Sequence, residues 1–111
     1  MTEPVIDMAV YNELADTAGA EFVAELAGTF MEEAPPMLAE LRTAQAAGKA
    51  DAFRRAAHSL KTNSVTFGAT QLGAMARDLE LGGLIADAAP LDALEAEYRK
   101  VEAALKGIIG G

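Results

Sequence analysis

His58 is the only histidine in the chain, and Arg54 and Lys61 precede and follow it at helical spacing. At about 100° per residue, Arg54 lies one turn before His58 and Lys61 nearly one turn after it. A neutral imidazole is a good nucleophile near physiological pH. The two cations favour the neutral ring and would offset a phosphoryl group attached to it. The pattern predicts a histidine that accepts and passes on a phosphoryl group, since phosphoryl transfer depends mainly on positioning and charge stabilisation.

Basic residues are concentrated around His58 in a chain that is otherwise acidic. The formal net charge is −8 over 111 residues, which argues against nucleic acid or an anionic membrane as a partner. One short stretch holds five basic residues and a single acid, Asp51, and leaves four basic and sixteen acidic residues elsewhere. The five are Arg42, Lys49, Arg54, Arg55 and Lys61. They predict a basic patch for an acidic partner, although a solvated helix face would have the same composition.

Other chemistries fit the sequence less well. The chain has no cysteine and no second histidine, and the nearest acid predicted on the His58 face is Asp51, so we expect no metal site. No set of nucleophile, base and orienting group converges as a hydrolase needs, and no phosphate-binding glycine loop is present. The remaining acids, including Glu32, Glu33, Glu95 and Glu97, are interpreted as solvated helix faces.

Apolar residues recur at helical spacing in five segments, and no strand is predicted. The first three segments run from about Asp7 to Ala15, from Ala20 to Ala47 and from Lys49 to Phe67. The fourth begins at Ala69 or Thr70 and ends at Gly82, and the fifth begins between Ala88 and Leu91. Pro35 and Pro36 predict a kink in the second segment rather than a break, because the apolar phase continues across them. The last four residues, 108–111, are expected to fray, with the apolar pair Ile108 and Ile109 against the core.

These segments predict an all-α fold with a single domain over residues 1–111. Four long amphipathic helices joined by short turns favour an antiparallel four-helix bundle, with the short first helix packed across one end. The N-terminal residues 1–4 do not resemble a secretory signal, and no apolar run reaches the roughly 18 residues that span a bilayer. We therefore expect a cytoplasmic protein, and Met1 suggests a complete small one.

On a wheel of the third segment, one narrow arc is predicted to face the core. That arc comprises Phe53, Ala56, Ala57, Leu60, Ser64 and Phe67. His58 falls on the polar side, roughly 140° from Phe53, together with Asp51, Arg54, Lys61, Thr62 and Val65. An outward histidine on a stiff helix could serve as a relay point, although an ordinary surface histidine has the same geometry.

Residues 57–69 of this sequence resemble the histidine-containing phosphotransfer (HPt) domain family. The matching positions are His58, Leu60, Lys61, Ser64, Gly68 and Ala69. The resemblance extends over most of the chain and includes Phe30, Leu38, Leu41, Leu72, Ala76, Leu79 and Glu80.

The resemblance implies a phosphocarrier without kinase activity or an ATP site. His58 would take a phosphoryl group from a receiver-domain aspartate and return it to another, with Lys61 supporting the phosphoryl group and Arg54 adding charge. Arg55, Thr62 and Val65 would contact the partner. The implied partners are response-regulator receiver domains and a hybrid histidine kinase. The protein would act as a monomer with no cofactor of its own, and magnesium would come from the receiver.

Thr62 departs from the family pattern, in which glycine usually follows the lysine. The Thr62 side chain would lie on the His58 face, where it would either crowd an incoming receiver or hydrogen-bond the phosphate or the backbone. Two further hypotheses therefore stay open. One is a module of the same fold that binds a receiver or kinase without carrying phosphate, and the other is a helical assembly protein that pairs through apolar surface.

Overall fold

The computed structural model describes residues 5–110, which form five helices and no strand. They are α1 (Met8–Ala18), α2 (Ala20–Ala47), α3 (Ala50–Thr66), α4 (Thr70–Gly82) and α5 (Ala89–Gly110). The bounds of α2, α3 and α4 lie within one residue of those predicted from the sequence. The predictions for residues 1–4 and 111 lie outside the described residues.

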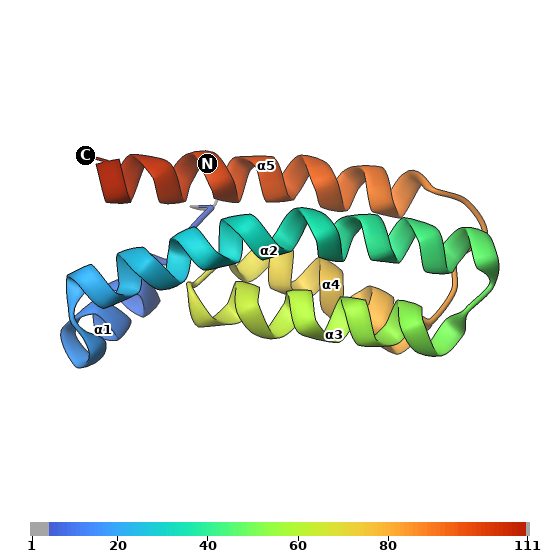
Figure 1. Ribbon diagram of the computed structural model, residues 1–111, viewed down its shortest axis with the longest axis horizontal. Helices are drawn as coiled ribbons and strands as arrows, with labels where there is room; N and C mark the ends of the chain where they lie inside the picture. Colours follow the sequence, from blue (N-terminus) through green and yellow to red (C-terminus); the bar gives the residue numbers. More distant parts are fainter. Residues whose placement is uncertain (1–4, 111) are drawn as a thin grey trace.

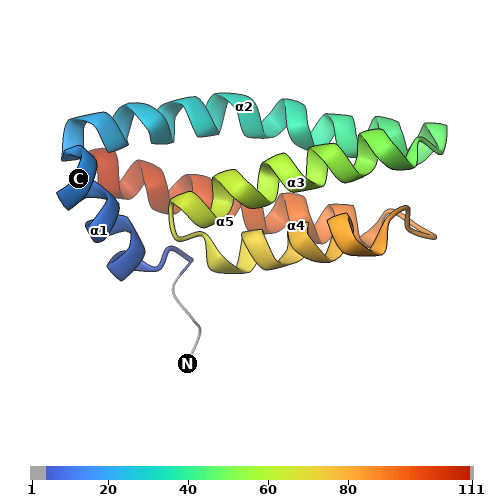
Figure 2. The same ribbon diagram turned by 90° about the horizontal axis from the view of Figure 1, so that it is seen from below.

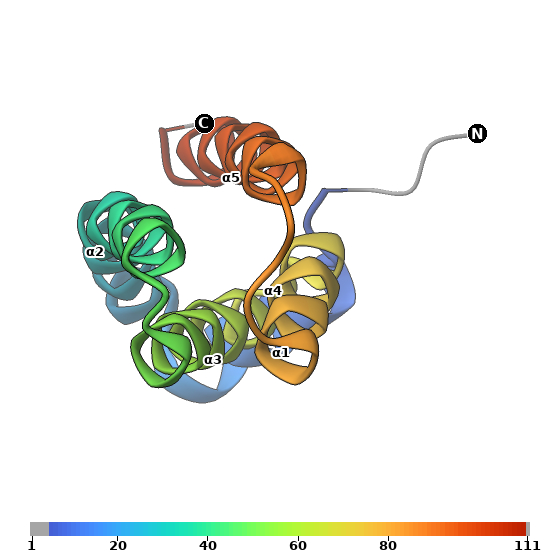
Figure 3. The same ribbon diagram turned by 90° about the vertical axis from the view of Figure 1, so that its right-hand side faces the viewer.

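The long helices α2, α3, α4 and α5 form an antiparallel bundle, and α1 crosses one end of it (Figures 1 and 2). Seen along the bundle, α3 and α4 lie side by side in one layer, with α2 and α5 above them (Figure 3). The largest fully buried side chains include Phe53, Leu41, Leu60, Leu72 and Leu94. The predicted fold is confirmed, and the apolar stripes of the helices meet in one core.

Helix α1 ends three residues later than predicted. The Asp7 side chain caps its start by accepting a hydrogen bond from the backbone N–H of Ala9 (3.0 Å), as predicted. Thr17 and Ala18 continue the helix, which ends where Gly19 takes a φ of 95°. The backbone N–H of Asp7 also donates to the carbonyl of Gly68 (2.7 Å), which joins the start of α1 to the turn between α3 and α4.

Helix α2 continues unbroken through Pro35 and Pro36, as predicted, but it curves gently where a kink was expected (Figure 1). Proline has no N–H, so Pro35 leaves the carbonyl of Met31 without its usual partner four residues on. The hydroxyl of Tyr98, on α5, donates to that carbonyl at 3.2 Å. The Tyr98 ring is buried and packs edge-on against Phe30 at 6.0 Å between ring centroids. A neighbouring helix therefore supplies the hydrogen bond that the first proline removes.

Removing this hydroxyl with Tyr98→Phe should destabilise the protein by about 1–2 kcal/mol, because the Met31 carbonyl loses the donor that replaces the missing helical N–H. In a Pro35→Ala background, the Met31 carbonyl regains a helical N–H. Tyr98→Phe should then lower the free energy of unfolding by measurably less than it does with Pro35 in place. A double-mutant cycle of urea unfolding measures the difference. Equal costs in both backgrounds would show that the hydroxyl does not compensate for Pro35.

Helix α5 extends through Gly110, so the prediction of a fraying end was wrong for the described residues. Ile108 is partly buried against the core, while Ile109 is exposed, so only one residue of the expected apolar pair packs. At the other end of the bundle, the Gln45 side chain accepts from the backbone N–H of Ile85 (3.0 Å) and donates to its carbonyl. This pair fixes the α4–α5 connection to α2. Within residues 5–110, no helix has the length and apolarity needed to cross a membrane.

Candidate functional site

Helix α3 positions His58 by burying its opposite face. Every residue of the predicted core arc, from Phe53 to Phe67, is buried. The His58 side chain keeps 56% of its surface exposed, so the ring points to solvent from the middle of the helix as predicted. A packed core beneath a regular helix holds the backbone of His58 rigidly while leaving the ring accessible.

A glutamate of α4, Glu80, binds both His58 and Lys61. Its Oε2 lies 2.5 Å from His58 Nδ1, and its Oε1 lies 2.9 Å from Lys61 Nζ. The Glu80 side chain is only 16% exposed and therefore has a fixed position between the two helices. The sequence analysis named Asp51 as the nearest acid on the His58 face, but the acid that contacts the ring is Glu80 of α4, and Asp51 pairs with Arg54 at 3.7 Å.

The charge state of Glu80 determines which ring nitrogen of His58 can react. The hydrogen bond from Lys61 is the largest cause that lowers the pKa of Glu80, and the hydrogen bond from His58 adds to it against the opposing effect of burial. An ionised carboxylate can only accept hydrogen bonds, so Nδ1 of His58 carries the hydrogen in this contact. In the neutral ring, the lone pair is then on Nε2.

The five basic residues predicted as one patch do not form one. Arg42 faces α5, where it pairs with Asp92 at 2.7 Å and Glu95 at 2.6 Å. Glu95 is therefore an ion-paired residue and not a solvated acid, because α2 and α5 pack side by side at this level. Lys49 lies at the exposed start of α3. Arg54, Arg55 and Lys61 are the three that remain near His58.

The predicted partner contacts lie on two different sides of His58. Arg54 and Arg55 line a hollow with His58, Ser59 and Glu80. Thr62 is exposed and lines a shallow depression with His58 and with Met37 of α2.

Val65 lies on the α4 side of the histidine face. Its side chain is 57% exposed and rests above Gly73 of α4, where a Cβ atom would lie 3.0 Å from Val65 Cγ2. Glycine at position 73 therefore lets α4 approach α3 closely beside the site.

Glu80 is the functional residue that reasoning from the sequence did not assign. It follows the buried Leu79 and so lies at the edge of the apolar stripe of α4, where a side chain meets the neighbouring helix. An acid at such an edge, opposite a histidine and a lysine on an antiparallel neighbour, is the signal that could have identified it.

No other cluster in the described part of the chain competes with this site. Residues 5–110 contain no group of three or more potential ligands that could hold a metal ion. A groove of about 460 Å³ between α2 and α5 is lined by Pro35, Leu38, Tyr98 and several charged residues. It shares no lining residue with the hollows beside His58, and its Arg42 is already neutralised by Asp92 and Glu95.

Two comparisons with known proteins found a match to this chain. The family model described as the Hpt domain matches residues 15–104. The crystal structure of histidine-containing phosphotransfer protein B (HptB) from Pseudomonas aeruginosa PAO1 is similar to this chain, with a TM-score of 0.85 and 26% sequence identity. The match covers 98% of this chain and 97% of that one. No curated protein shows a significant match to this sequence.

Proposed function

Because this chain belongs to the Hpt domain family, and thus is a histidine phosphotransfer protein of phosphorelay signalling, we propose that His58 carries the phosphoryl group. The observation that supports this assignment is the exposed ring whose Nδ1 is bound to Glu80, which leaves Nε2 for reaction. It is the only histidine in the chain.

The transfer step follows from that geometry. The Nε2 lone pair attacks the phosphorus of a receiver's aspartyl phosphate, so a P–N bond forms while the P–O bond to the aspartate breaks. The aspartate leaves as a carboxylate. The ring gains positive charge in this step, and Glu80, which accepts the Nδ1–H, offsets it. Return of the phosphoryl group to another receiver reverses the same bond changes.

Lys61 and Arg54 provide positive charge for the phosphoryl oxygens. Lys61 Nζ is already held next to the ring by Glu80, and its flexible stem lets it reach a phosphoryl group on Nε2. Among residues 5–110, the one ion pair of Arg54 is a 3.7 Å contact to Asp51, and 62% of its side chain is exposed. We expect the magnesium ion that assists aspartyl-phosphate chemistry to be held by the receiver and not by this chain.

The proposal extends to the partners and the setting. Hpt domains interact with receiver domains and histidine kinases, and we propose response-regulator receivers and a hybrid kinase as the partners of this chain. It would act in the cytoplasm as a monomer, with neither kinase activity nor an ATP site of its own. Arg55, Thr62 and Val65 are exposed beside His58 and remain the proposed contacts.

Incubation with a radiolabelled phospho-receiver tests the proposal. The label on this protein should be lost in acid and kept in base, because a P–N bond hydrolyses in acid whereas a phosphoserine ester is acid-stable. An acid-stable label would contradict phosphorylation on histidine. Receiver binding without any label would instead favour the binding module that carries no phosphate.

A further inference from the structure

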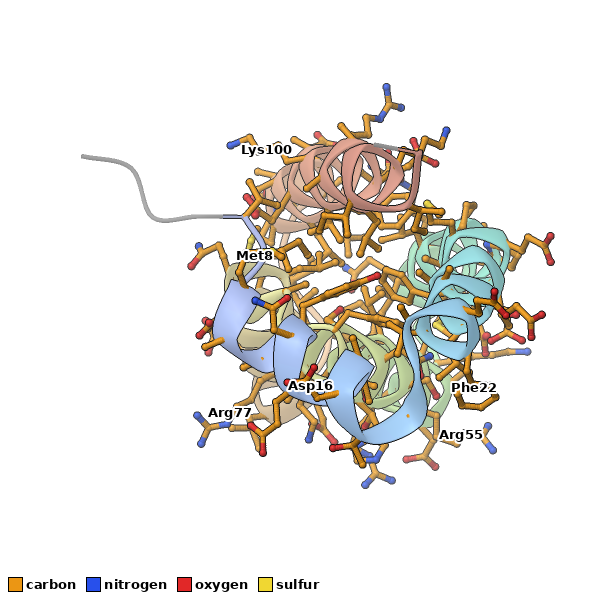
Figure 4. The ribbon with its side chains drawn as sticks, turned by 90° about the vertical axis from the view of Figure 1, so that its left-hand side faces the viewer. Met8, Asp16, Phe22, Arg55, Arg77 and Lys100 are labelled. Carbon is orange, nitrogen blue, oxygen red and sulfur yellow. The ribbon has the colours of Figure 1, made fainter. Side chains whose placement is uncertain are left out.

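The three cations near His58 lie on two sides of its ring. Counted at about 100° per residue, Arg54 and Lys61 lie about 40° and 60° from His58 on the side of α4. Arg55 lies about 60° from His58 in the opposite direction, on the side of α2. Looking along the bundle, Arg55 projects from the edge of α3 next to α2, whereas Arg77 projects from the far edge of α4 (Figure 4).

The contact with Glu80 determines which way the reactive edge of the ring faces. In an imidazole, Nδ1 and Nε2 belong to opposite edges of the ring, because Cδ2 separates Nε2 from the carbon that carries the side chain. Glu80 of α4 binds Nδ1 of His58, so the edge that carries Nε2 faces away from α4. A phosphoryl group on Nε2 is therefore directed to the side on which Arg55 lies.

A hollow of about 420 Å³ beside His58 has room for this phosphoryl group. Side chains on a helix lean towards its N-terminus, so the His58 ring lies over the turn that carries both arginines. Lys61 does not line the hollow. The residues that line it are Arg54, Arg55, His58, Ser59 and Glu80.

Two of the three cations are already bound to acids. Lys61 Nζ lies 2.9 Å from a carboxylate oxygen of Glu80, and a guanidinium nitrogen of Arg54 lies 3.7 Å from one of Asp51. Each of these cations must share its charge between its carboxylate and any phosphoryl group that it contacts. Their attraction for phosphoryl oxygens is reduced accordingly.

The charge of Arg55 is not shared in this way. Within residues 5–110, Arg55 forms no ion pair, although Glu40 of α2 lines an adjacent hollow with it. The Arg55 side chain is exposed, so its guanidinium is free to turn towards the His58 ring. The unpaired cation and the Nε2 edge of the ring are thus on the same side of α3.

We propose that Arg55 binds the phosphoryl group on Nε2 of His58, with two guanidinium N–H groups donating to two phosphoryl oxygens. This assignment rests on the proposed function, because it requires a phosphorylated His58. The planar fork of a guanidinium matches two oxygens of a phosphoryl group, and charge-assisted hydrogen bonds are stronger than neutral ones. Arg55 then holds the phosphoryl group from the α2 side, while Lys61 reaches it from the α4 side.

Labelling by phosphoramidate tests the proposal without a receiver. In this reaction the bond from phosphorus to Nε2 forms while the P–N bond of the protonated donor breaks and ammonia leaves. Arg55→Gln removes the charge and the fork and should lower the rate constant for labelling about fivefold. Arg55→Lys keeps the charge without the fork and should fall between the two. Arg77→Gln, the matched change of an exposed arginine on the far edge of α4, should be labelled as fast as wild type.

The ³¹P chemical shift of the phosphorylated proteins, followed as the pH is varied, gives a second readout. A guanidinium in contact with the phosphoryl oxygens favours their more highly charged form. Arg55→Gln should therefore raise the pKa of the phosphoryl group, and Arg77→Gln should leave it unchanged. A purely structural role of Arg55 would not change this pKa.

The outcomes separate the proposal from the function on which it rests. An unchanged phosphoryl pKa in Arg55→Gln would overturn the role of Arg55, whatever the labelling rate, and leave phosphorylation of His58 standing. Failure of the wild-type protein to be labelled by phosphoramidate or by any receiver would instead refute the role of His58.

Discussion

Replacing His58 with glutamine should abolish phosphoryl uptake from a phospho-receiver. Glutamine can still donate a hydrogen bond towards Glu80, but its amide nitrogen has no nucleophilic lone pair, so no P–N bond can form. Because the chain has no second histidine, the loss should be complete within the sensitivity of a radiolabel assay. His58 is exposed, so the melting temperature should stay close to that of the wild type.

Ser59→Ala is the matched control for His58→Gln. Ser59 is the next residue along α3, is also exposed, and carries the nearest hydroxyl in the chain sequence. Removing that hydroxyl should leave labelling unchanged. If His58→Gln took up label as fast as wild type, or if Ser59→Ala lost it, the phosphoryl group would not be on His58.

Leu60→Ala should destabilise the protein by about 2–5 kcal/mol, since a fully buried leucine leaves a cavity in the bundle core. The next residue, Lys61, lies on the other side of the helix surface with its amine bound to Glu80. Lys61→Ala should lower the free energy of unfolding by no more than about 1 kcal/mol, because the ion pair between Lys61 and Glu80 is partly solvated. The same variant should slow phosphoryl transfer roughly 10- to 100-fold, because a cation next to the phosphoryl oxygens is lost.

Denaturant unfolding and transfer kinetics on the two variants separate these effects. We expect a large loss of stability with little direct change in transfer for folded Leu60→Ala, and the reverse for Lys61→Ala. Matching unfolding curves for the two proteins would contradict the division of α3 into a core face and a reactive face.

The features that the sequence predicted are those set by local spacing. The outward direction of His58 follows from the apolar period of a single helix, and the end of α2 follows from Gly48, which takes a φ of 68°. The end of α1 was predicted too early, at Ala15, because Thr17 and Ala18 were not counted as helical, although only Gly19 interrupts the helix. Local signals also could not show that the Tyr98 hydroxyl donates to the Met31 carbonyl, which lacks its helical partner because of Pro35.

The features that could not be predicted depend on how helices align. Glu80 is 22 residues from His58, and its contact depends on the register between α3 and α4. The same register places Gly73 beneath Val65. Arg42 was grouped with the basic patch because it is near in sequence, yet it binds Asp92 and Glu95, which are 50 and 53 residues away. The role of Thr62 and the absence of a bound metal remain predictions.

The central claim is that Glu80 holds Nδ1 of His58 and leaves Nε2 to carry the phosphoryl group. Nuclear magnetic resonance of ¹⁵N-histidine-labelled protein, with ³¹P correlation after phosphorylation, identifies the nitrogen that is bonded to phosphorus. We predict a P–N bond at Nε2 and a proton retained on Nδ1. Phosphorus on Nδ1, or a neutral ring with its proton on Nε2 before reaction, would contradict the account.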